Sequence, residues 1–226
     1  MTNPKLKVDG VLFDLDGTIL DSIGIYFQII ETVFDRLAIV MPPREKLCDA
    51  AKTGEFEWEQ VFPAKTPGEM EDLINRTREI TASIYPKLFG GNIKLVPRAK
   101  ETLEALLHKG IKLGVVTSTP RQNLTLKMPA LAGAGIKDLL GVIVAADDAP
   151  RKKPAPDPLL AGSRRLEISP ARCLYVGDSR TDIQAGKAAG MKTVGVLTGM
   201  DDLAALSREK PDAVIDSIAD LGDMLV

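Results

Sequence analysis

The sequence has little of what several common classes of hydrolase need. Among its 226 residues there is one histidine, His108, and there are two cysteines, Cys48 and Cys173. A Ser-His-Asp triad could be built only around His108, which falls at 100–109, a segment with the leucine spacing of a helix. Neither cysteine has the Cys-x5-Arg spacing of a cysteine-based phosphatase, and no Gly-x4-Gly-Lys-Ser/Thr loop occurs. Hydrolytic chemistry must therefore rely chiefly on carboxylates, hydroxyls, lysine and metal.

A strong charge of one sign and long apolar runs are also missing. The formal net charge is -2 and the pI is about 5.6, so no excess positive charge attracts nucleic acid or anionic lipid. No stretch approaches the ~18 apolar residues of a membrane span, and residues 1–7 lack the apolar run of a signal peptide. Two thiols in a chain of this length suit a reducing compartment. We expect a cytoplasmic protein without nucleic-acid or membrane partners.

The first part of the chain changes from a strand pattern to a helical one. A buried-strand pattern at 8–15 ends at Gly17-Thr18, and from Ser22 apolar residues recur at helical spacing. Further helical segments are predicted at 44–53, 56–62 and 67–88. No convincing strand falls between Ser22 and Leu88, so this region is predicted to be a small all-helical module.

Strands and helices alternate after residue 90. Strands are predicted at 112–117, 142–146, 173–176, 193–196 and 213–215, and helical segments at 99–109, 121–140, 157–166, 181–189, 201–208 and 217–225. The segment 121–140 is expected to be interrupted at Pro129 and at the turn 133–135. Alternation implies a parallel sheet with helices on both faces. The prediction is an α/β, three-layer Rossmann-like core at 1–21 and 90–226, with a helical domain inserted at 22–89.

Polar clusters follow four of the predicted strands, which is where ligands bind in open α/β sheets. The clusters are Asp14, Asp16 and Thr18 after the first strand, Thr117-Ser118 after the second, Lys153-Pro154 shortly after the third, and Gly177-Asp178 after the fourth. Parallel strands bring their carboxyl ends to one edge of the sheet. The four clusters are therefore expected to converge.

Asp14 and Asp16 are two residues apart, so in an extended segment their side chains point to the same side. One carboxylate can then attack phosphorus while the other handles a proton. Gly17 permits a sharp exit and lets backbone N–H groups approach phosphate oxygens. Helix capping or a structural calcium site is the alternative interpretation of this carboxylate pair.

The other clusters supply groups that phosphoryl transfer needs, and each has an ordinary structural alternative. Thr117 and Ser118 offer donors to a phosphoryl oxygen or cap a helix. Lys153 supplies positive charge to a transferring phosphoryl group or is a solvated surface lysine. Asp178 offers an oxygen ligand to a hard cation. Asp182, four residues further on, either positions the residues that contact substrate or metal or carries charge on a helix surface.

In their order along the chain these residues resemble the haloacid dehalogenase superfamily, in its phosphoglycolate-phosphatase-like branch. The segment 14–22 (Asp-Leu-Asp-Gly-Thr-Ile-Leu-Asp-Ser) is similar to the first family motif, and 115–118 (Val-Val-Thr-Ser) to the second. The segment 153–157 (Lys-Pro-Ala-Pro-Asp) is similar to the third motif, and 176–182 (Val-Gly-Asp-Ser-Arg-Thr-Asp) to the fourth. The resemblance covers nearly the whole chain, and its first and fourth motifs are highly specific.

The resemblance implies a magnesium-dependent phosphatase acting on a small phosphorylated metabolite, either phosphoglycolate-like or a sugar phosphate. Asp14 would be the nucleophile that forms an aspartyl-phosphate. Asp16 would protonate the leaving oxygen and then activate water, which needs a raised pKa at Asp16. Mg²⁺ would be held by the Asp14 side chain, the Asp16 backbone carbonyl and Asp178.

The remaining roles follow from the same resemblance. Thr117 and Lys153 would act in catalysis by orienting and neutralising the phosphoryl group, with Lys152 as the second choice for the lysine. The residues implied to bind the substrate phosphate are Asp16, Gly17, Thr117, Ser118 and Lys153. Thr18, Ser179 and Asp182 are expected just behind the groups that touch substrate or metal.

The insertion at 22–89 matches the position of the family's helical cap, which closes over the site and selects substrates. Closure would occur about Gly90-Gly91. A cap specificity loop is expected to contain a glycine, here Gly54, and Lys52, Trp58 and Arg76 are candidates for facing the substrate. The alternative is a packed tryptophan and two surface cations.

Two other functions remain open from the sequence. A phosphomutase of the β-phosphoglucomutase type shares the core and the cap, although it usually carries a β-branched apolar residue at the position of Thr18. A non-catalytic phosphometabolite-binding protein would keep the fold, but the catalytic side chains are complete. Asp16 argues against a dehalogenase, which lacks this second aspartate. The physiological substrate and the oligomeric state are not predictable from these residues.

Overall fold

A parallel sheet forms the centre of the larger part of the molecule. The computed structural model describes residues 4–51, 56–63, 66–90 and 93–226. Six strands pair in the order β5-β4-β1-β6-β7-β8, and all neighbours are parallel. Their bounds are β1 Gly10–Phe13, β4 Lys112–Val116, β5 Val142–Val144, β6 Cys173–Gly177, β7 Lys192–Val196 and β8 Ala213–Ile215. The central strands of this parallel sheet are buried on both faces, which explains why their sequences are almost continuously apolar.

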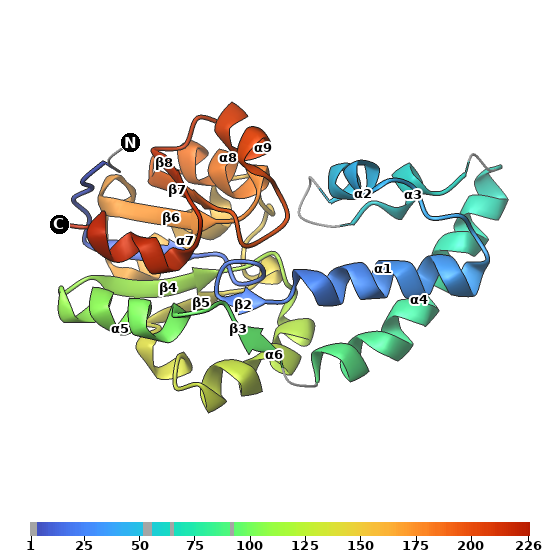
Figure 1. The fold of residues 1–226 in the computed structure, drawn as a ribbon, viewed down its shortest axis with the longest axis horizontal. Coiled ribbons are helices and arrows are strands. Elements are labelled where there is room, and N and C mark those ends of the chain that lie inside the picture. Colours follow the sequence, from blue (N-terminus) through green and yellow to red (C-terminus); the bar gives the residue numbers. More distant parts are fainter. Residues whose placement is uncertain (1–3, 52–55, 64–65, 91–92) are drawn as a thin grey trace.

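Helices cover both faces of this sheet, which gives the core three layers (Figure 1). Val11 and Phe13 of β1 pack into one hydrophobic cluster, whereas Leu12 between them packs into another, because successive strand side chains alternate in direction. The first cluster includes residues of α5 Ala99–His108, α6 Arg121–Gly133 and η4 Ile218–Asp223. The second includes residues of α7 Asp157–Leu166 and α8 Arg180–Ala188. The remaining elements of the core are α9 Leu203–Arg208 and the short 3₁₀ helices η1 Lys137–Leu139, η2 Ala146–Asp148 and η3 Pro170–Arg172.

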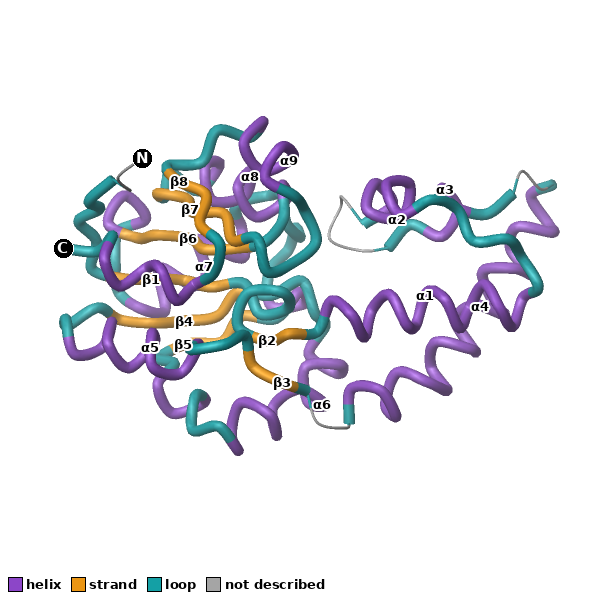
Figure 2. The backbone as a smooth tube through the Cα atoms, in the orientation of Figure 1, coloured by secondary structure: helices purple, strands orange, loops and turns teal. Residues whose placement is uncertain are grey.

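The helices that precede α5 in the chain form a cap beside the core (Figure 1). It contains α1 Ile23–Leu37, α2 Arg44–Ala50, α3 Trp58–Val61 and α4 Pro67–Phe89. The long helices α1 and α4 lie side by side and α2 and α3 lie across from them, as the tube in Figure 2 also shows. A separate hydrophobic cluster, including Val33, Phe34, Leu47, Val61 and Leu73, holds the cap together.

The register of the central strands positions the site. Phe13 at the end of β1 lies opposite Val115 of β4 and opposite Val176 of β6. Asp14 therefore leaves the sheet between the ends of its two neighbours, and the loops beginning at Thr117 and Asp178 start at the same edge. A two-stranded antiparallel ribbon, β2 Leu20–Asp21 with β3 Lys94–Leu95, joins this edge to the cap.

The α/β fold with a parallel sheet and an inserted helical cap is confirmed. The domain boundaries at residues 21/22 and 89/90 stay a prediction. One local expectation was wrong, and one element was not expected. Helix α6 continues through Pro129, since a proline removes one backbone hydrogen bond without always ending a helix that tertiary packing supports. The ribbon β2–β3 was not expected, because two-residue strands are too short for a period-2 pattern.

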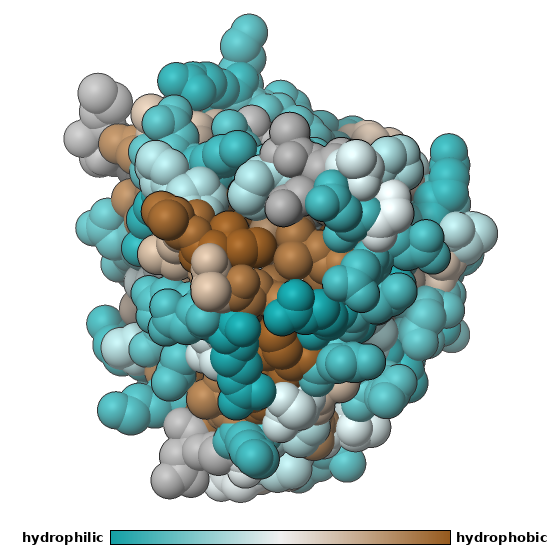
Figure 3. Space-filling model, turned by 90° about the vertical axis from the view of Figure 1, so that its right-hand side faces the viewer, coloured by the Kyte–Doolittle hydropathy of each residue, from teal (hydrophilic) through white to brown (hydrophobic). Residues whose placement is uncertain are grey.

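Few large hydrophobic side chains are exposed on the described part of the chain. Val40 and Met41, in the connection between α1 and α2, are among them. Figure 3 views the cap end of the molecule and shows a recessed band of hydrophobic side chains between hydrophilic ones. None of the helices in the described ranges combines the length and the apolar character needed to span a bilayer.

Candidate active site

The carboxyl ends of the central strands and the inner side of the cap enclose a cavity of about 340 Å³. Eight of the core residues singled out in the sequence line it: Asp14, Asp16, Thr117, Ser118, Lys153, Asp178, Ser179 and Asp182. They come from the loops after β1, β4 and β6, from the loop that precedes α7 and, for Asp182, from the first turn of α8. The predicted convergence of the four clusters is therefore found in the structure.

The loop after β1 is shaped by Gly17. This glycine has a φ of 73°, in the left-handed region, and a Cβ here would lie 2.6 Å from Oδ2 of Asp178. Only glycine lets the first loop approach the fourth so closely. The Thr198 hydroxyl donates a hydrogen bond to the Gly17 carbonyl at 2.6 Å. The buried hydroxyl of Thr18 has no hydrogen-bond partner among the described residues, so its surroundings do not explain why this residue is a threonine.

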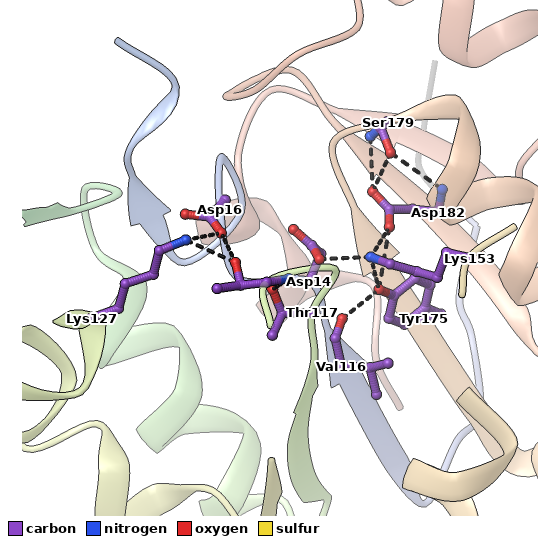
Figure 4. Close-up of polar contacts among 10 residues, drawn as sticks. Asp14, Asp16, Val116, Thr117, Lys127, Lys153, Tyr175, Ser179 and Asp182 are labelled. Atoms are coloured by element: carbon purple, nitrogen blue, oxygen red, sulfur yellow. Dashed lines mark hydrogen bonds and ion pairs between the residues drawn. The ribbon is translucent and has the colours of Figure 1, made fainter. Parts of the chain in front are cut away.

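Lys153 links the carboxylates of Asp14 and Asp182 (Figure 4). Its buried ammonium lies 2.7 Å from Oδ1 of Asp14 and 2.6 Å from Oδ1 of Asp182, and it donates to the Tyr175 hydroxyl at 2.9 Å. The Tyr175 hydroxyl donates in turn to the Val116 carbonyl at 2.8 Å. Because all three ammonium protons have an oxygen partner, the lysine is held rigidly. Its neighbour Lys152 is exposed.

Asp182 is buried in the site and is not a surface charge. It lies in the first turn of α8 and forms a capping box with Ser179, whose hydroxyl and backbone N–H both donate to Oδ2 of Asp182. Its other carboxylate oxygen faces Lys153. Ser179 thus orients Asp182, and Asp182 orients the lysine.

Three buried carboxylates gather where a cation would be favourable. Asp14, Asp178 and Asp182 each place an oxygen within 4.8 Å of the others. Burial and the negative charges of Asp182 and Asp16 raise the pKa of Asp14 to about 7, although Lys153 opposes the shift. Burial, followed by the charges of Asp182 and Asp14, raises the pKa of Asp178 well above its ordinary value. This excess of negative charge suits a hard cation, and oxygen donors are the ligands that Mg²⁺ prefers.

The environment of Asp16 differs from the expectation. The Ser22 hydroxyl donates to its Oδ1 at 2.6 Å, while Thr119 and Lys127 donate to its Oδ2 at 2.9 and 2.6 Å. Burial raises the pKa of the Asp16 carboxyl, but the positive charge of Lys127 and these hydrogen bonds outweigh it, so the pKa lies below its ordinary value. The acid role needs a raised pKa, and burial alone does not supply it here, because the charge of Lys127, which no sequence motif indicated, and the hydrogen bonds together outweigh burial.

Buried residues of this site that were missed in the sequence include Thr119, Lys127 and Tyr175. Lys127 occupies α6 between Leu124 and Leu131, and all three side chains are buried on one helix face. A lysine on the apolar face of a helix was the available signal. Tyr175 lies in the middle of the buried strand β6, and a polar atom within such a strand needs a partner. Neither Lys127 nor Tyr175 belongs to a recognisable motif.

The residues predicted to act in the cap have different outcomes in the structure. Trp58 lines the cavity and also stacks on Phe62 with ring centroids 5.6 Å apart, so packing and a place at the site are compatible. Arg76 lies on the exposed side of α4 and does not line the cavity. Lys52, Gly54 and the second glycine of the predicted hinge, Gly91, lie outside the described residues.

A parallel α/β sheet with buried carboxylates and a paired lysine at its strand ends, below a helical cap, defines a phosphoryl-transfer hydrolase. A family model described as haloacid dehalogenase-like hydrolase matches residues 11–196. The phosphoglycolate phosphatase of Escherichia coli (strain K12) is 32% identical over 232 residues, covering 95% of this chain and 91% of that protein. The crystal structure of a predicted phosphoglycolate phosphatase from Haemophilus somnus 129PT has a TM-score of 0.77 at 25% identity, covering 96% of this chain and 97% of that one.

The chain belongs to the haloacid dehalogenase-like hydrolase family, as the resemblance of its motifs indicated, and it is a phosphatase.

Proposed function

We propose that this phosphatase hydrolyses a small phosphate monoester through an aspartyl-phosphate on Asp14. The observation that carries the proposal is the position of Asp14, buried at the strand edge with Lys153 2.7 Å from one carboxylate oxygen. The pairing leaves the second oxygen for attack on phosphorus. Thr117, Ser118 and the backbone of Gly17 are suited to bind the phosphoryl oxygens, and Lys153, whose three donors are engaged, supplies positive charge beside them.

Asp16 handles the proton in both steps. In the first, the Asp14 carboxylate attacks phosphorus, the bond to the leaving oxygen breaks, and Asp16 gives its proton to that oxygen. In the second, water attacks the phosphorus of the aspartyl-phosphate, Asp16 takes a proton from the water, and Asp14 is released. The first step requires protonated Asp16, and the charge of the bound phosphoryl group acts against Lys127 by raising the Asp16 pKa.

Magnesium is the metal that we propose for this site. The Asp14 and Asp178 side chains and the Asp16 backbone carbonyl would hold it. Asp182 is also near, but hydrogen bonds from Lys153 and from Ser179 engage both of its oxygens. When bound, Mg²⁺ neutralises charge on the transferring phosphoryl group.

Two observations favour two different types of leaving group. The relatives are phosphoglycolate phosphatases, which favours a small carboxylated alcohol. The cap side of the cavity, in contrast, is lined by apolar and aromatic side chains in the described part of the chain: Ile23, Tyr26, Ile29, Ile30, Phe56, Trp58 and Tyr85. The Thr81 hydroxyl also lines the cavity, is buried and has no partner within the described residues. This lining favours a leaving group with an apolar part and one polar atom.

A panel of phosphate esters with Mg²⁺ tests the proposal by phosphate release. We include 2-phosphoglycolate, 2-hydroxyethyl phosphate and benzyl phosphate, which differ in the charge and apolar area of the leaving group, and β-glucose 1-phosphate. We expect release from at least one ester. Asp14→Asn should abolish it, and Asp16→Asn should lower kcat about 10²- to 10⁴-fold, the usual contribution of an acid–base group.

The ratio of kcat/KM between benzyl phosphate and 2-phosphoglycolate decides between the two leaving groups. Isomerised sugar phosphate without phosphate release would instead indicate a mutase. Metal binding without turnover of any ester would indicate a binding protein and overturn the proposal. An active Asp14→Asn variant would overturn the role of the nucleophile.

A further inference from the structure

Lys127 is a fully buried charge that the four family motifs do not include. It lies in the middle of α6 with none of its surface exposed. Its ammonium is 2.6 Å from Oδ2 of Asp16 and donates to the hydroxyls of Thr119 and Tyr26, each at 2.8 Å. A lysine has three ammonium protons, so each of them has an oxygen partner. Burying an ammonium without partners would cost free energy. Here the charge of Asp16 and the hydrogen bonds to Thr119 and Tyr26 compensate for that cost.

The same contacts fix the orientation of the Asp16 carboxylate. Oδ1 accepts from Ser22, and Oδ2 accepts from Lys127 and Thr119. Thr119 also accepts from Lys127, so Oδ2 of Asp16, the Lys127 ammonium and the Thr119 hydroxyl form a closed triangle. Figure 4 shows Lys127 approaching Asp16 from the side opposite to Lys153, which binds Asp14. Each of the two aspartates therefore has its own buried lysine.

The Lys127 ammonium also contacts the two helix ends at which the chain enters and leaves the cap. Tyr26 is in the first turn of α1, and Phe89 is the last residue of α4. The ammonium lies 5.2 Å from the centroid of the Tyr26 ring and 4.7 Å from that of Phe89, within range of a cation–π interaction. The two rings meet edge to face with centroids 5.1 Å apart. Core and cap thus enclose the ammonium together.

We propose that Lys127 is a positioning residue, which holds the Asp16 carboxylate in its catalytic orientation and is itself held between the core and the two helix ends at which the cap begins and ends. The role rests on the proposed function of Asp16 as acid and base. Lys127 does not itself touch the substrate, since its three donors are engaged and it does not line the cavity.

Comparing two substrates tests this role. An alkyl phosphate such as 2-hydroxyethyl phosphate needs a proton on its leaving oxygen, whereas 4-nitrophenyl phosphate has a leaving group that departs without one. In Lys127→Met we expect kcat/KM to fall about 10- to 100-fold for the alkyl ester, less than the full contribution of an acid–base group, and much less for the nitrophenyl ester. The ratio kcat/KM is compared because it covers the steps up to departure of the leaving group and excludes hydrolysis of the aspartyl-phosphate, which is the same for both esters. Lys127→Arg should recover part of the loss, because it restores a buried positive charge.

Three further variants control the experiment. Lys137→Met makes the same chemical change at an exposed position in η1 and should leave both substrates unaffected. Tyr26→Phe keeps the aromatic ring and removes only the hydroxyl partner, so a smaller loss with the same substrate preference is expected. Thr119→Val, which is nearly isosteric, should act in the same way and carries the test if Lys127→Met does not fold, as checked by circular dichroism.

The outcomes separate the positioning role from the proposed function. Equal losses of kcat/KM for both esters in Lys127→Met and Thr119→Val would show that Lys127 serves only folding or binding. An Asp16→Asn enzyme with normal turnover of the alkyl ester would instead overturn the acid–base role on which the inference rests. A loss selective for the alkyl ester, partly recovered by arginine, supports it.

Discussion

Residues of one type acquire different properties at this site according to what surrounds them. Asp14 and Asp16 are two residues apart, yet burial among carboxylates raises the pKa of Asp14 to about 7, and Lys127 lowers that of Asp16. A cation bound at the carboxylate cluster would lower the pKa of Asp14 again, since opposite charge favours the ionised form. At this scale each aspartate depends on a lysine that is distant in the sequence.

Gly17 leads to a prediction at the same scale. Alanine here would combine a strained left-handed backbone, about 1–2 kcal/mol, with a Cβ 2.6 Å from the Asp178 carboxylate. We expect Gly17→Ala to lower kcat about tenfold or more and to raise the Mg²⁺ concentration needed for half-maximal phosphate release. Gly110 has a similar φ of 78° with nothing within 4 Å of its would-be Cβ, so Gly110→Ala controls for strain alone. Equal losses of activity in the two variants would contradict this explanation.

At the scale of elements, the short helix α3 depends on tertiary packing. It has four residues, too few for an isolated helix to be stable, and the Trp58 ring contacts the rings of Phe34, Phe56 and Phe62. The same ring lines the cavity. Packing of the cap and shape of the cavity are therefore linked through one side chain.

Truncation of this side chain is expected to affect stability and substrate binding together. For Trp58→Ala we expect the free energy of unfolding to fall by about 3 kcal/mol, the lower end for a large aromatic residue because Trp58 is only half-buried. We also expect a raised KM. Urea denaturation and steady-state kinetics measure the two effects, with Arg76→Ala on the exposed side of α4 as a control within about 0.5 kcal/mol of wild type. An unchanged KM would restrict Trp58 to packing.

For the whole molecule, the site exists only when the sheet is assembled. Its carboxylates come from the loops after β1 and β6, and Lys153 comes from a third loop. A cation that binds this assembled cluster binds the folded state alone, and such binding stabilises by about 2.7 kcal/mol at a concentration one hundred times its Kd.

Thermal unfolding with and without magnesium tests this linkage. We expect Mg²⁺ to raise the Tm of the wild-type protein and EDTA to reverse the rise and abolish phosphate release. Asp178→Asn should lose the response to Mg²⁺. Without the metal this variant should be at least as stable as wild type, because burial and neighbouring carboxylates disfavour the charged Asp178 and raise its pKa. A magnesium response that persists in Asp178→Asn would exclude this residue as a ligand.

The sequence by itself determined the chemistry-bearing loops and the fold class. Strand patterns at 8–15 and 173–176, alternating with helices, implied a parallel sheet, and such a sheet brings polar residues at its strand ends to one edge. These signals are local: each depends on residues within a few positions of one another. For the same reason most predicted element bounds lie within a few residues of the observed ones. At α7 the predicted and observed bounds are the same, 157–166.

Only the tertiary structure decided which neighbours each of these residues has. Lys127 lies 111 positions from Asp16, and Lys153 lies 139 positions from Asp14. The order of the pKa values depends on these long-range pairs, on burial and on the cap, because electrostatic interactions act through space and strengthen where water is excluded. The motif thus predicts two aspartates at a phosphoryl-transfer site, and folding sets how readily each of them ionises.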